Sequence, residues 1–190
     1  YSGDSMTASA APIPATPIVT LTALSSSSLN VSWMTVIGAS GYEIYRSTTK
    51  YGIYAMIKTL VGTNFTNVGL ISGKSYYYKV RAYRMVGTVK VYSSYSSITS
   101  AQPLPATPTI KTNLISSTSV EISWAKISGI TYYDLYENDV KIATITNTSQ
   151  TSYVQTGLNI GLNYSYFLIA RNNNLSSVKS NISTILTVLQ

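Results

Sequence analysis

The chain has 190 residues, of which 45% are hydrophobic and only 10% charged, and it contains no cysteine and no histidine. Without these two residue types the chain has no disulfides, no cysteine nucleophile and neither of the commonest zinc ligands. Its net charge is +7, from 13 Lys and Arg against 6 Asp and Glu. The basic residues are scattered, which favours simple solubility or an affinity for anionic cell-wall polymers over a nucleic-acid partner.

Tyrosine dominates the aromatic residues, with 17 Tyr against 2 Phe and 2 Trp. This composition is typical of half-buried β-strands, where the ring packs and the hydroxyl group reaches water. The low charge and the abundance of Ser and Thr favour an extracellular or cell-surface location. No apolar stretch approaches the roughly 18 residues that a membrane span needs.

The first 102 residues predict a lead-in segment followed by short strands. Residues 1–11 are rich in Ser and Ala, and we expect them to be mobile or bound to a partner. In residues 29–33 apolar and polar side chains alternate, which predicts a strand with one buried face. Residues 38–41 predict a turn into a third strand at residues 42–46. A long strand follows at residues 76–82, and no segment shows a sustained helical period.

The same order of elements recurs in the second half of the chain. Pro14-Ala15-Thr16-Pro17 returns at 105–108, Ser32-Trp33 at 123–124 and Tyr42-Glu43-Ile44-Tyr45 as 133–136, all at an offset of 91. Further along, the offset is 88, from Leu70 to Leu158 and from Tyr76 to Tyr164. Repeated landmarks on both sides of one length change indicate a duplicated domain, with a longer loop in the first copy between Tyr45 and Leu70.

Each copy resembles a fibronectin type III domain over nearly its whole length. The resemblance depends on a Pro-rich entry, a second-strand Trp, a third-strand Tyr-x-aliphatic motif and a Leu–Tyr–Ala series, in the order Pro14, Pro17, Trp33, Tyr42, Ile44, Leu70, Tyr76 and Ala82, then Pro105, Pro108, Trp124, Tyr133, Leu135, Leu158, Tyr164 and Ala170. It implies an all-β fold of two tandem immunoglobulin-like, seven-stranded β-sandwiches. It also implies a structural core containing Trp33, Trp124, Tyr76 and Tyr164, in which the last two make tyrosine corners.

The resemblance also bears on domain limits and origin. We expect a lead-in at 1–11, one domain at 12–102 and a second at 103–190. The family usually has Pro in the turn before the corner tyrosine, whereas Gly73 and Gly161 stand there in this chain. The amino-acid sequence of the first copy is similar to that of modules from bacterial exported surface proteins and polysaccharide-degrading enzymes.

The acidic residues argue against catalysis. There are only six, and Glu43 and Asp134 occupy equivalent strands of different domains, so they cannot act as an acid–base pair. We therefore predict no enzyme activity and no cofactor. Glu137-Asn138-Asp139 could offer oxygen ligands to Ca²⁺, but we interpret it as a hairpin turn, because Asn and Asp tolerate left-handed backbone.

Strand alternation also predicts an interaction surface. If Tyr76, Tyr78, Val80 and Ala82 face inward, the residues between them face solvent. The outward aromatic and apolar side chains that we single out as a possible interaction surface are Tyr45, Tyr77, Tyr83, Tyr136, Phe167 and Ile169. Exposed apolar side chains that lie together tend to mark interfaces. A weak, nonspecific glycan platform at Tyr45, Tyr77 and Tyr83 is an alternative, because aromatic rings also stack on sugar rings.

Three functions follow as alternatives. The first is a non-catalytic spacer or accessory module of a larger extracellular or cell-surface protein, in contact with neighbouring domains or other subunits. The second is a self-assembling subunit of a surface filament, layer or phage-like particle, suggested by Phe167, Ile169 and an apolar C-terminus. The third is a weak glycan-binding module for cell-wall or other polysaccharides. The fold itself does not choose among them.

Overall fold

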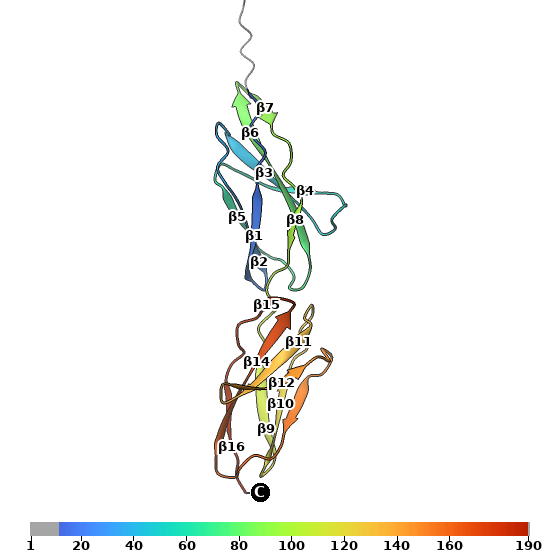
Figure 1. Cartoon of the computed structure of the whole chain (residues 1–190), viewed down its shortest axis with the longest axis vertical. Coiled ribbons are helices and arrows are strands. Elements are labelled where there is room, and N and C mark those ends of the chain that lie inside the picture. Colours follow the sequence, from blue (N-terminus) through green and yellow to red (C-terminus); the bar gives the residue numbers. More distant parts are fainter. Residues whose placement is uncertain (1–11, 190) are drawn as a thin grey trace, which may run out of the picture. The chain divides into compact units, whose positions relative to one another are not determined.

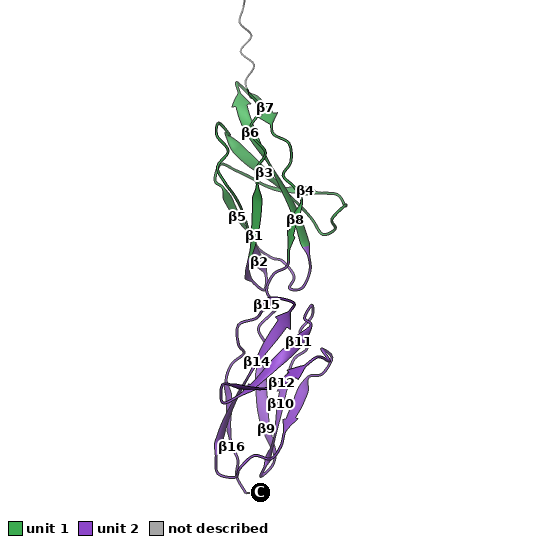
Figure 2. Cartoon of the chain, in the orientation of Figure 1, with its two compact units in different colours: residues 1–22, 30–66, 76–101 green, residues 23–29, 67–75, 102–190 purple. Residues whose placement is uncertain are grey.

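The computed structural model describes residues 12–189, so the predicted lead-in at 1–11 lies outside the described residues. Between residues 12 and 189 no segment is helical, and so no helix there could cross a membrane. Strands β1–β8 pair only with one another, as do β9–β16 (Figure 1). We call these groups the first and second sandwich. By compactness the described chain divides into one unit of residues 12–22, 30–66 and 76–101 and a second unit of residues 23–29, 67–75 and 102–189 (Figure 2).

The first sandwich has one three-stranded and one five-stranded sheet. The smaller sheet has the order β1 (Val19–Ser25), β2 (Ser28–Trp33), β5 (Asn64–Asn67). The larger sheet has the order β4 (Ala55–Leu60), β3 (Gly41–Ser47), β6 (Tyr76–Val86), β7 (Val89–Tyr92), with β8 (Thr99–Ala101) also paired to β6.

The second sandwich repeats this arrangement. Its smaller sheet has the order β13 (Ser152–Gln155), β10 (Ser119–Trp124), β9 (Ile110–Ser116). Its larger sheet has the order β12 (Val140–Ile145), β11 (Tyr132–Glu137), β14 (Asn163–Asn172), β15 (Leu175–Ser176), with β16 (Ser183–Leu186) also paired to β14. The predicted all-β fold of two sandwiches is confirmed, with the seventh strand of each split into two short segments.

Alternation along the strands builds each core. Trp33 packs on Tyr42 with ring centroids 5.2 Å apart, and Trp124 packs on Tyr133 at 5.5 Å. Both indoles are 6% exposed. All members of the predicted inward sets of β6 and β14 are buried, namely Tyr76, Tyr78, Val80 and Ala82, then Tyr164, Tyr166, Leu168 and Ala170.

Serine side chains explain why the last strand is split. Ser93 and Ser96 follow β7, and each accepts a hydrogen bond at its hydroxyl from a β6 amide, from Ala82 N at 2.9 Å and from Val80 N at 3.0 Å. The backbone amides of the same serines donate to the carbonyls of Ala82 and Val80. Hydroxyl groups thus replace the carbonyls of a regular strand, and no buried β6 amide at these positions is left without an acceptor.

The second sandwich has the same serine pair. Ser177 and Ser180 accept hydrogen bonds from Ala170 N at 3.0 Å and from Leu168 N at 2.9 Å. We call Ser93 and Ser96, and Ser177 and Ser180, the serine edges of the two sandwiches. These four serines therefore have a structural role in their sandwiches.

Turns and tyrosine anchors fix the connections. The predicted hairpin at Asn138 and Asp139 is confirmed, since both residues have positive φ, 47° and 63°. Residues 48–54 make the corresponding connection in the first sandwich, which confirms the longer loop.

The Tyr164 hydroxyl accepts a hydrogen bond from Asn159 N at 3.0 Å, as a tyrosine corner requires. Gly161 has a φ of 82° in the turn before it, which favours glycine.

A second tyrosine anchor was missed by sequence reasoning. The Tyr42 hydroxyl accepts a hydrogen bond from Val36 N at 2.8 Å, and the Tyr133 hydroxyl accepts one from Ile127 N at 3.0 Å. The third-strand tyrosine of each copy therefore fastens the loop before its own strand.

Candidate interaction face of the first sandwich

The outer face of the sheet β4–β3–β6–β7 gathers tyrosines and cations. Successive side chains of a strand point to opposite faces, so Tyr77, Lys79, Arg81 and Tyr83 form one row along β6. This row is about 20 Å long at the usual rise per residue. On β3, Tyr45 lies opposite Lys79 and Glu43 lies opposite Arg81.

Glu43 lies at the centre of this face. One carboxylate oxygen accepts hydrogen bonds from Arg81 Nη2 at 2.8 Å and from the Tyr45 hydroxyl at 2.9 Å, and the other from Lys90 Nζ at 3.0 Å and the Tyr92 hydroxyl at 3.1 Å. Burial alone would raise the pKa of Glu43, but these four donors lower it to about 2. Burial and the bond to this carboxylate raise the pKa of Tyr45, so Glu43 is ionised and Tyr45 protonated at neutral pH.

Lys79 lies among tyrosine rings. Its Nζ is 4.0 Å from the centroid of Tyr95, 4.8 Å from that of Tyr54 and 5.9 Å from that of Tyr45. An ammonium within about 6 Å of a ring centroid is attracted by the electron-rich face of the ring. None of the ion pairs found within residues 12–189 includes Lys79.

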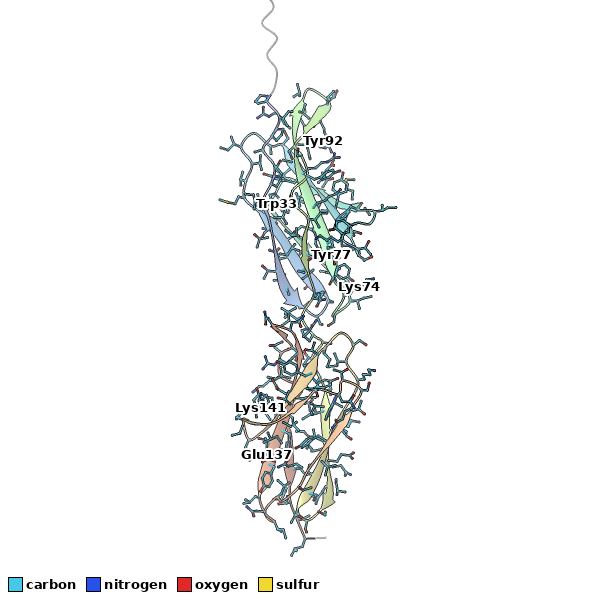
Figure 3. The ribbon with its side chains drawn as sticks, turned by 45° about the vertical axis from the view of Figure 1, so that its right-hand side comes forward. Trp33, Lys74, Tyr77, Tyr92, Glu137 and Lys141 are labelled. Atoms are coloured by element: carbon cyan, nitrogen blue, oxygen red, sulfur yellow. The ribbon has the colours of Figure 1, made fainter. Side chains whose placement is uncertain are left out.

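Two more cations complete the pattern. The Arg81 guanidinium lies 3.7 Å from the Tyr92 ring centroid, and Lys90 Nζ lies 4.2 Å from that of Tyr83. Tyr92 lies toward one end of the face and Tyr77 toward the other (Figure 3). We call this set the tyrosine–cation face, made of Glu43, Tyr45, Tyr54, Tyr77, Lys79, Arg81, Tyr83, Lys90, Tyr92 and Tyr95.

The three residues singled out in the first copy differ in exposure. Tyr45 and Tyr77 are half-buried, with their rings on the outer face. The expectation that Tyr83 is exposed was wrong, because it is only 9% exposed. Its hydroxyl lies 2.5 Å from the position that a Cβ would take at Gly41, and Lys90 and Tyr92 flank its ring. Because Gly41 has no side chain, the Tyr83 ring can approach β3 closely.

In the second sandwich the expected exposed strip is largely covered. Phe167 is 8% exposed, which corrects its assignment as an exposed residue, because its ring stacks on Tyr136 with centroids 4.5 Å apart and planes 9° from parallel. Lys179 Nζ lies 5.2 Å from the Phe167 centroid. Ile169 and Tyr136 are half-buried.

An acid–cation network also lies beneath this second face. Asp134 accepts hydrogen bonds from Arg171 Nε at 3.0 Å, from Lys141 Nζ at 3.4 Å and from the Thr144 hydroxyl at 3.0 Å. Its side chain is 5% exposed. Both sandwiches thus bury one strand carboxylate under cations on the outer face of the larger sheet.

Charge is divided unequally between the two halves. Residues 12–102 contain eight Lys and Arg and one carboxylate, Glu43, whereas residues 103–190 contain five Lys and Arg and four carboxylates. Since Glu43 is 3% exposed, the part of the chain from 12 to 102 exposes no carboxylate side chain. The net positive charge of the protein therefore resides on the first sandwich.

The main pockets of the described chain contain no carboxylate. Pockets beside Pro17 and Trp33, and the equivalent one beside Trp124, are lined by Ser, Thr, Lys and apolar side chains without a carboxylate. Among residues 12–189 no three His, Cys, Asp or Glu side chains lie close enough to hold a metal ion.

Sequence reasoning missed three aromatic members of the face, Tyr54, Tyr92 and Tyr95. Tyr54 lies in the extra loop of the first copy, where no repeat guides the assignment. Tyr95 lies between the serines of the edge, and the shared spacing of Ser93-x-x-Ser96 and Ser177-x-x-Ser180 was a usable signal. That spacing places Tyr95 and Lys179 at equivalent positions beside the long strand.

Comparisons with known proteins show similarity to parts of larger enzymes. No family model matches the sequence. The chain is 32% identical over 143 residues to exoglucanase B of Cellulomonas fimi, an alignment that covers 70% of this chain and 12% of that protein. It is 27% identical over 177 residues to chitinase A1 of Niallia circulans, covering 85% of this chain and 24% of that protein. The chain thus spans no more than 24% of the length of either relative.

Among solved structures, a segment of two fibronectin type III domains from chicken tenascin matches the chain with a TM-score of 0.61 and 18% identity. The match covers 90% of this chain and 99% of that segment. At this identity the likeness concerns the fold alone. The chain therefore folds as two tandem fibronectin type III domains, as the repeated tryptophan, tyrosine and proline landmarks predicted.

Proposed function

We propose that the chain is a non-catalytic accessory or spacer module of a larger extracellular protein, with its two domains at 12–102 and 103–190. The observation that supports this most is the unequal coverage of its relatives. Most of this chain aligns with an exoglucanase and a chitinase, yet the aligned region is only 12% and 24% of those enzymes. A region that recurs as a small part of different enzymes is expected to serve the enzyme without performing its reaction.

The chemistry of the buried carboxylates supports the same function. A general acid needs a pKa near the working pH, whereas hydrogen bonds hold the pKa of Glu43 at about 2. Asp134 is likewise bonded to Arg171, Lys141 and Thr144. Both groups therefore suit a role in stabilising the sheet better than one in proton transfer.

Two measurements on the purified chain test the proposal. We expect a monomer by light scattering up to millimolar concentration and no release of soluble sugar from cellulose or chitin. Fused to a reporter cellulase, the chain should leave the turnover of a small soluble substrate unchanged. Sugar release by the chain alone would contradict the non-catalytic role, and oligomers that grow with concentration would favour the assembly alternative.

The assembly alternative has lost its main support. It was suggested by an outward strip at Phe167 and Ile169, but Phe167 is covered by Tyr136 and Lys179. Exposed apolar residues do remain near the C-terminus, at Ile182, Leu186 and Leu189. Scattered exposed apolar side chains are ordinary on soluble proteins and need no partner.

Glycan binding is the second candidate, and the tyrosine–cation face favours it. Tyr95 is 39% exposed, and Tyr45, Tyr54 and Tyr77 are half-buried with their rings on or beside the same sheet face. A phenol combines an apolar ring with a polar tip, which suits the mixed surface of a sugar. Retention of the chain on immobilised polysaccharides tests this candidate independently of the accessory role.

A further inference from the structure

The tyrosine–cation face offers many hydrogen-bond donors and only one carboxylate. Ammonium and guanidinium groups only donate, whereas phenols both donate and accept. The single carboxylate of the face, Glu43, already accepts bonds from Arg81, Lys90, Tyr45 and Tyr92. An anionic ligand of this face would therefore meet cations and phenol hydroxyl groups, and no free carboxylate would repel it.

The face also keeps a positive charge that no protein group balances. Glu43 neutralises one of the three cations, Lys79, Arg81 and Lys90. Lys79 takes part in no ion pair of the described chain and is held by rings alone. A cation held in this way is already ordered and half-desolvated, so pairing it with an anion costs little further entropy.

Partly exposed rings surround this cation. Tyr95 and Tyr54 lie nearest to Lys79, and Tyr77 precedes it by two residues on the same strand face. The anion at Lys79 would thus arrive with flat apolar surface on either side. A chain of sugar rings bearing carboxylate or phosphate groups has both properties.

We infer that the tyrosine–cation face of the first sandwich binds an acidic polysaccharide, with an anionic group at Lys79 and sugar rings against Tyr77 and Tyr95. The inference rests on the glycan-binding candidate above and names its ligand class. An acidic polymer is favoured over a neutral one because Lys79 has no ion-pair partner among the described residues, so that an anionic group would balance its charge. A polysaccharide is favoured over a nucleic acid because the relatives are named as an exoglucanase and a chitinase.

The second sandwich provides a matched comparison. Its equivalent face places Phe167 and Lys179 where the first has Lys79 and Tyr95, and Phe167 is buried against Tyr136. Residues 103–190 also hold nearly balanced charges, five Lys and Arg against four carboxylates. We therefore expect the second sandwich to make no comparable contact with the ligand.

Titration calorimetry with the whole chain tests this at low ionic strength. Polygalacturonate supplies carboxylates, poly(glycerol phosphate) supplies phosphates without sugar rings, and fully methyl-esterified polygalacturonate is the uncharged control. We expect polygalacturonate to bind at least about tenfold more tightly than its ester, and binding to weaken as salt rises to 0.3 M. Poly(glycerol phosphate) should bind more weakly than polygalacturonate, because it has no ring to stack.

Variants locate the site. Lys79→Gln should weaken binding to polygalacturonate about tenfold and Tyr95→Ser about threefold, whereas Lys179→Gln should change it less than twofold. All three side chains lie at the surface, and an unchanged thermal unfolding midpoint checks that each variant folds.

The other outcomes separate the two proposals. Equal affinity for polygalacturonate and its methyl ester would overturn the assignment of an acidic polysaccharide as ligand, but would leave glycan binding in place. No binding of either polymer would overturn both, and would leave the accessory role to its own test. Equal or tighter binding of oligothymidylate, lost in Lys79→Gln, would assign the face to nucleic acid instead.

Discussion

The two domains place a cation and an aromatic ring at the same pair of positions, but in opposite order. In the first, Lys79 on the long strand β6 lies 4.0 Å from the ring centroid of Tyr95 between the edge serines. In the second, Phe167 on β14 takes the place of the lysine, and Lys179 takes that of the tyrosine, at 5.2 Å. The fold therefore accommodates the cation and the ring in either order. The order decides which of the two side chains is exposed to solvent.

This exchange separates two kinds of position. The tryptophan, the third-strand tyrosine and the serine edge have the same contacts in both domains, so they specify the fold. The outer sheet face differs, with partly exposed tyrosines in the first domain and a covered phenylalanine in the second. Function is therefore to be sought where the duplicated copies differ and not where they agree.

The cores should respond equally to damage. Ile44 and Leu135 are equivalent and fully buried, so Ile44→Ala and Leu135→Ala should each cost about 2–5 kcal/mol of unfolding free energy in their own domain. Because each domain has one tryptophan, chemical unfolding followed by fluorescence in Trp124→Phe or Trp33→Phe chains reports one domain at a time. A cost below about 1 kcal/mol in either domain would break the equivalence of the cores.

Acid should weaken the first domain through Glu43. Its pKa is lowered in the folded state, so its contribution to stability is fully present above about pH 4.5 and is lost as pH falls toward 2. The loss should be on the order of 2–3 kcal/mol. Glu43→Gln should lower stability at pH 7 and flatten the pH dependence of the first domain.

The matched control for Glu43 is Glu121→Gln, which changes a half-buried strand residue of the second domain. It should change stability by less than about 0.5 kcal/mol. A Glu43→Gln domain that still loses stability steeply between pH 4.5 and 2 would show that another group causes the acid effect.

Removing an edge serine should cost about the same in both domains. Ser96→Ala leaves the buried amide of Val80 without its hydroxyl acceptor, and Ser180→Ala does the same to Leu168. Each should cost about 1–3 kcal/mol by chemical denaturation. Ser94→Ala, at an exposed position between the edge serines, should be nearly neutral, and an equal cost there would remove the special role of the edge.

The smallest effect concerns the stacked pair of the second domain. A double-mutant cycle of Tyr136→Ala and Phe167→Ala should give a coupling energy of about 0.5–1.5 kcal/mol. Tyr45 and Lys79 occupy the same positions in the first domain, 5.9 Å from ring centroid to Nζ, and their coupling should be weaker. A stronger coupling in the first domain would reverse the distinction between a covered and an open face.

Periodicity and duplication were sufficient to predict the fold. Trp33 and Tyr42 recur at an offset of 91 and Tyr76 at 88, which identifies the duplicated strands. Alternation within each strand then indicates which face is buried, because a strand repeats every two residues. Exposure on the outer face was harder to predict. Phe167 and Tyr83 point outward as expected, but side chains of neighbouring segments cover them. The alternation within one strand does not show which side chains lie beside it in the sheet.

The tyrosine–cation face was predictable only in part. Tyr45 and Tyr77 follow from strand alternation, whereas Tyr54 and Tyr95 come from a loop and a non-strand segment whose places depend on tertiary packing. Glu43 appeared in sequence as an isolated strand acid. Its partner Lys90 is brought to it by the β6–β7 hairpin, a contact that no local pattern encodes.

The most direct test of the division between scaffold and binding face is an amide NMR titration of the whole chain with oligogalacturonate. We expect chemical-shift changes confined to amides around Tyr45, Lys79 and Tyr95, and no change at the equivalent amides around Tyr136, Phe167 and Lys179. Shifts of equal size in both domains, or shifts in the second domain alone, would contradict this expectation.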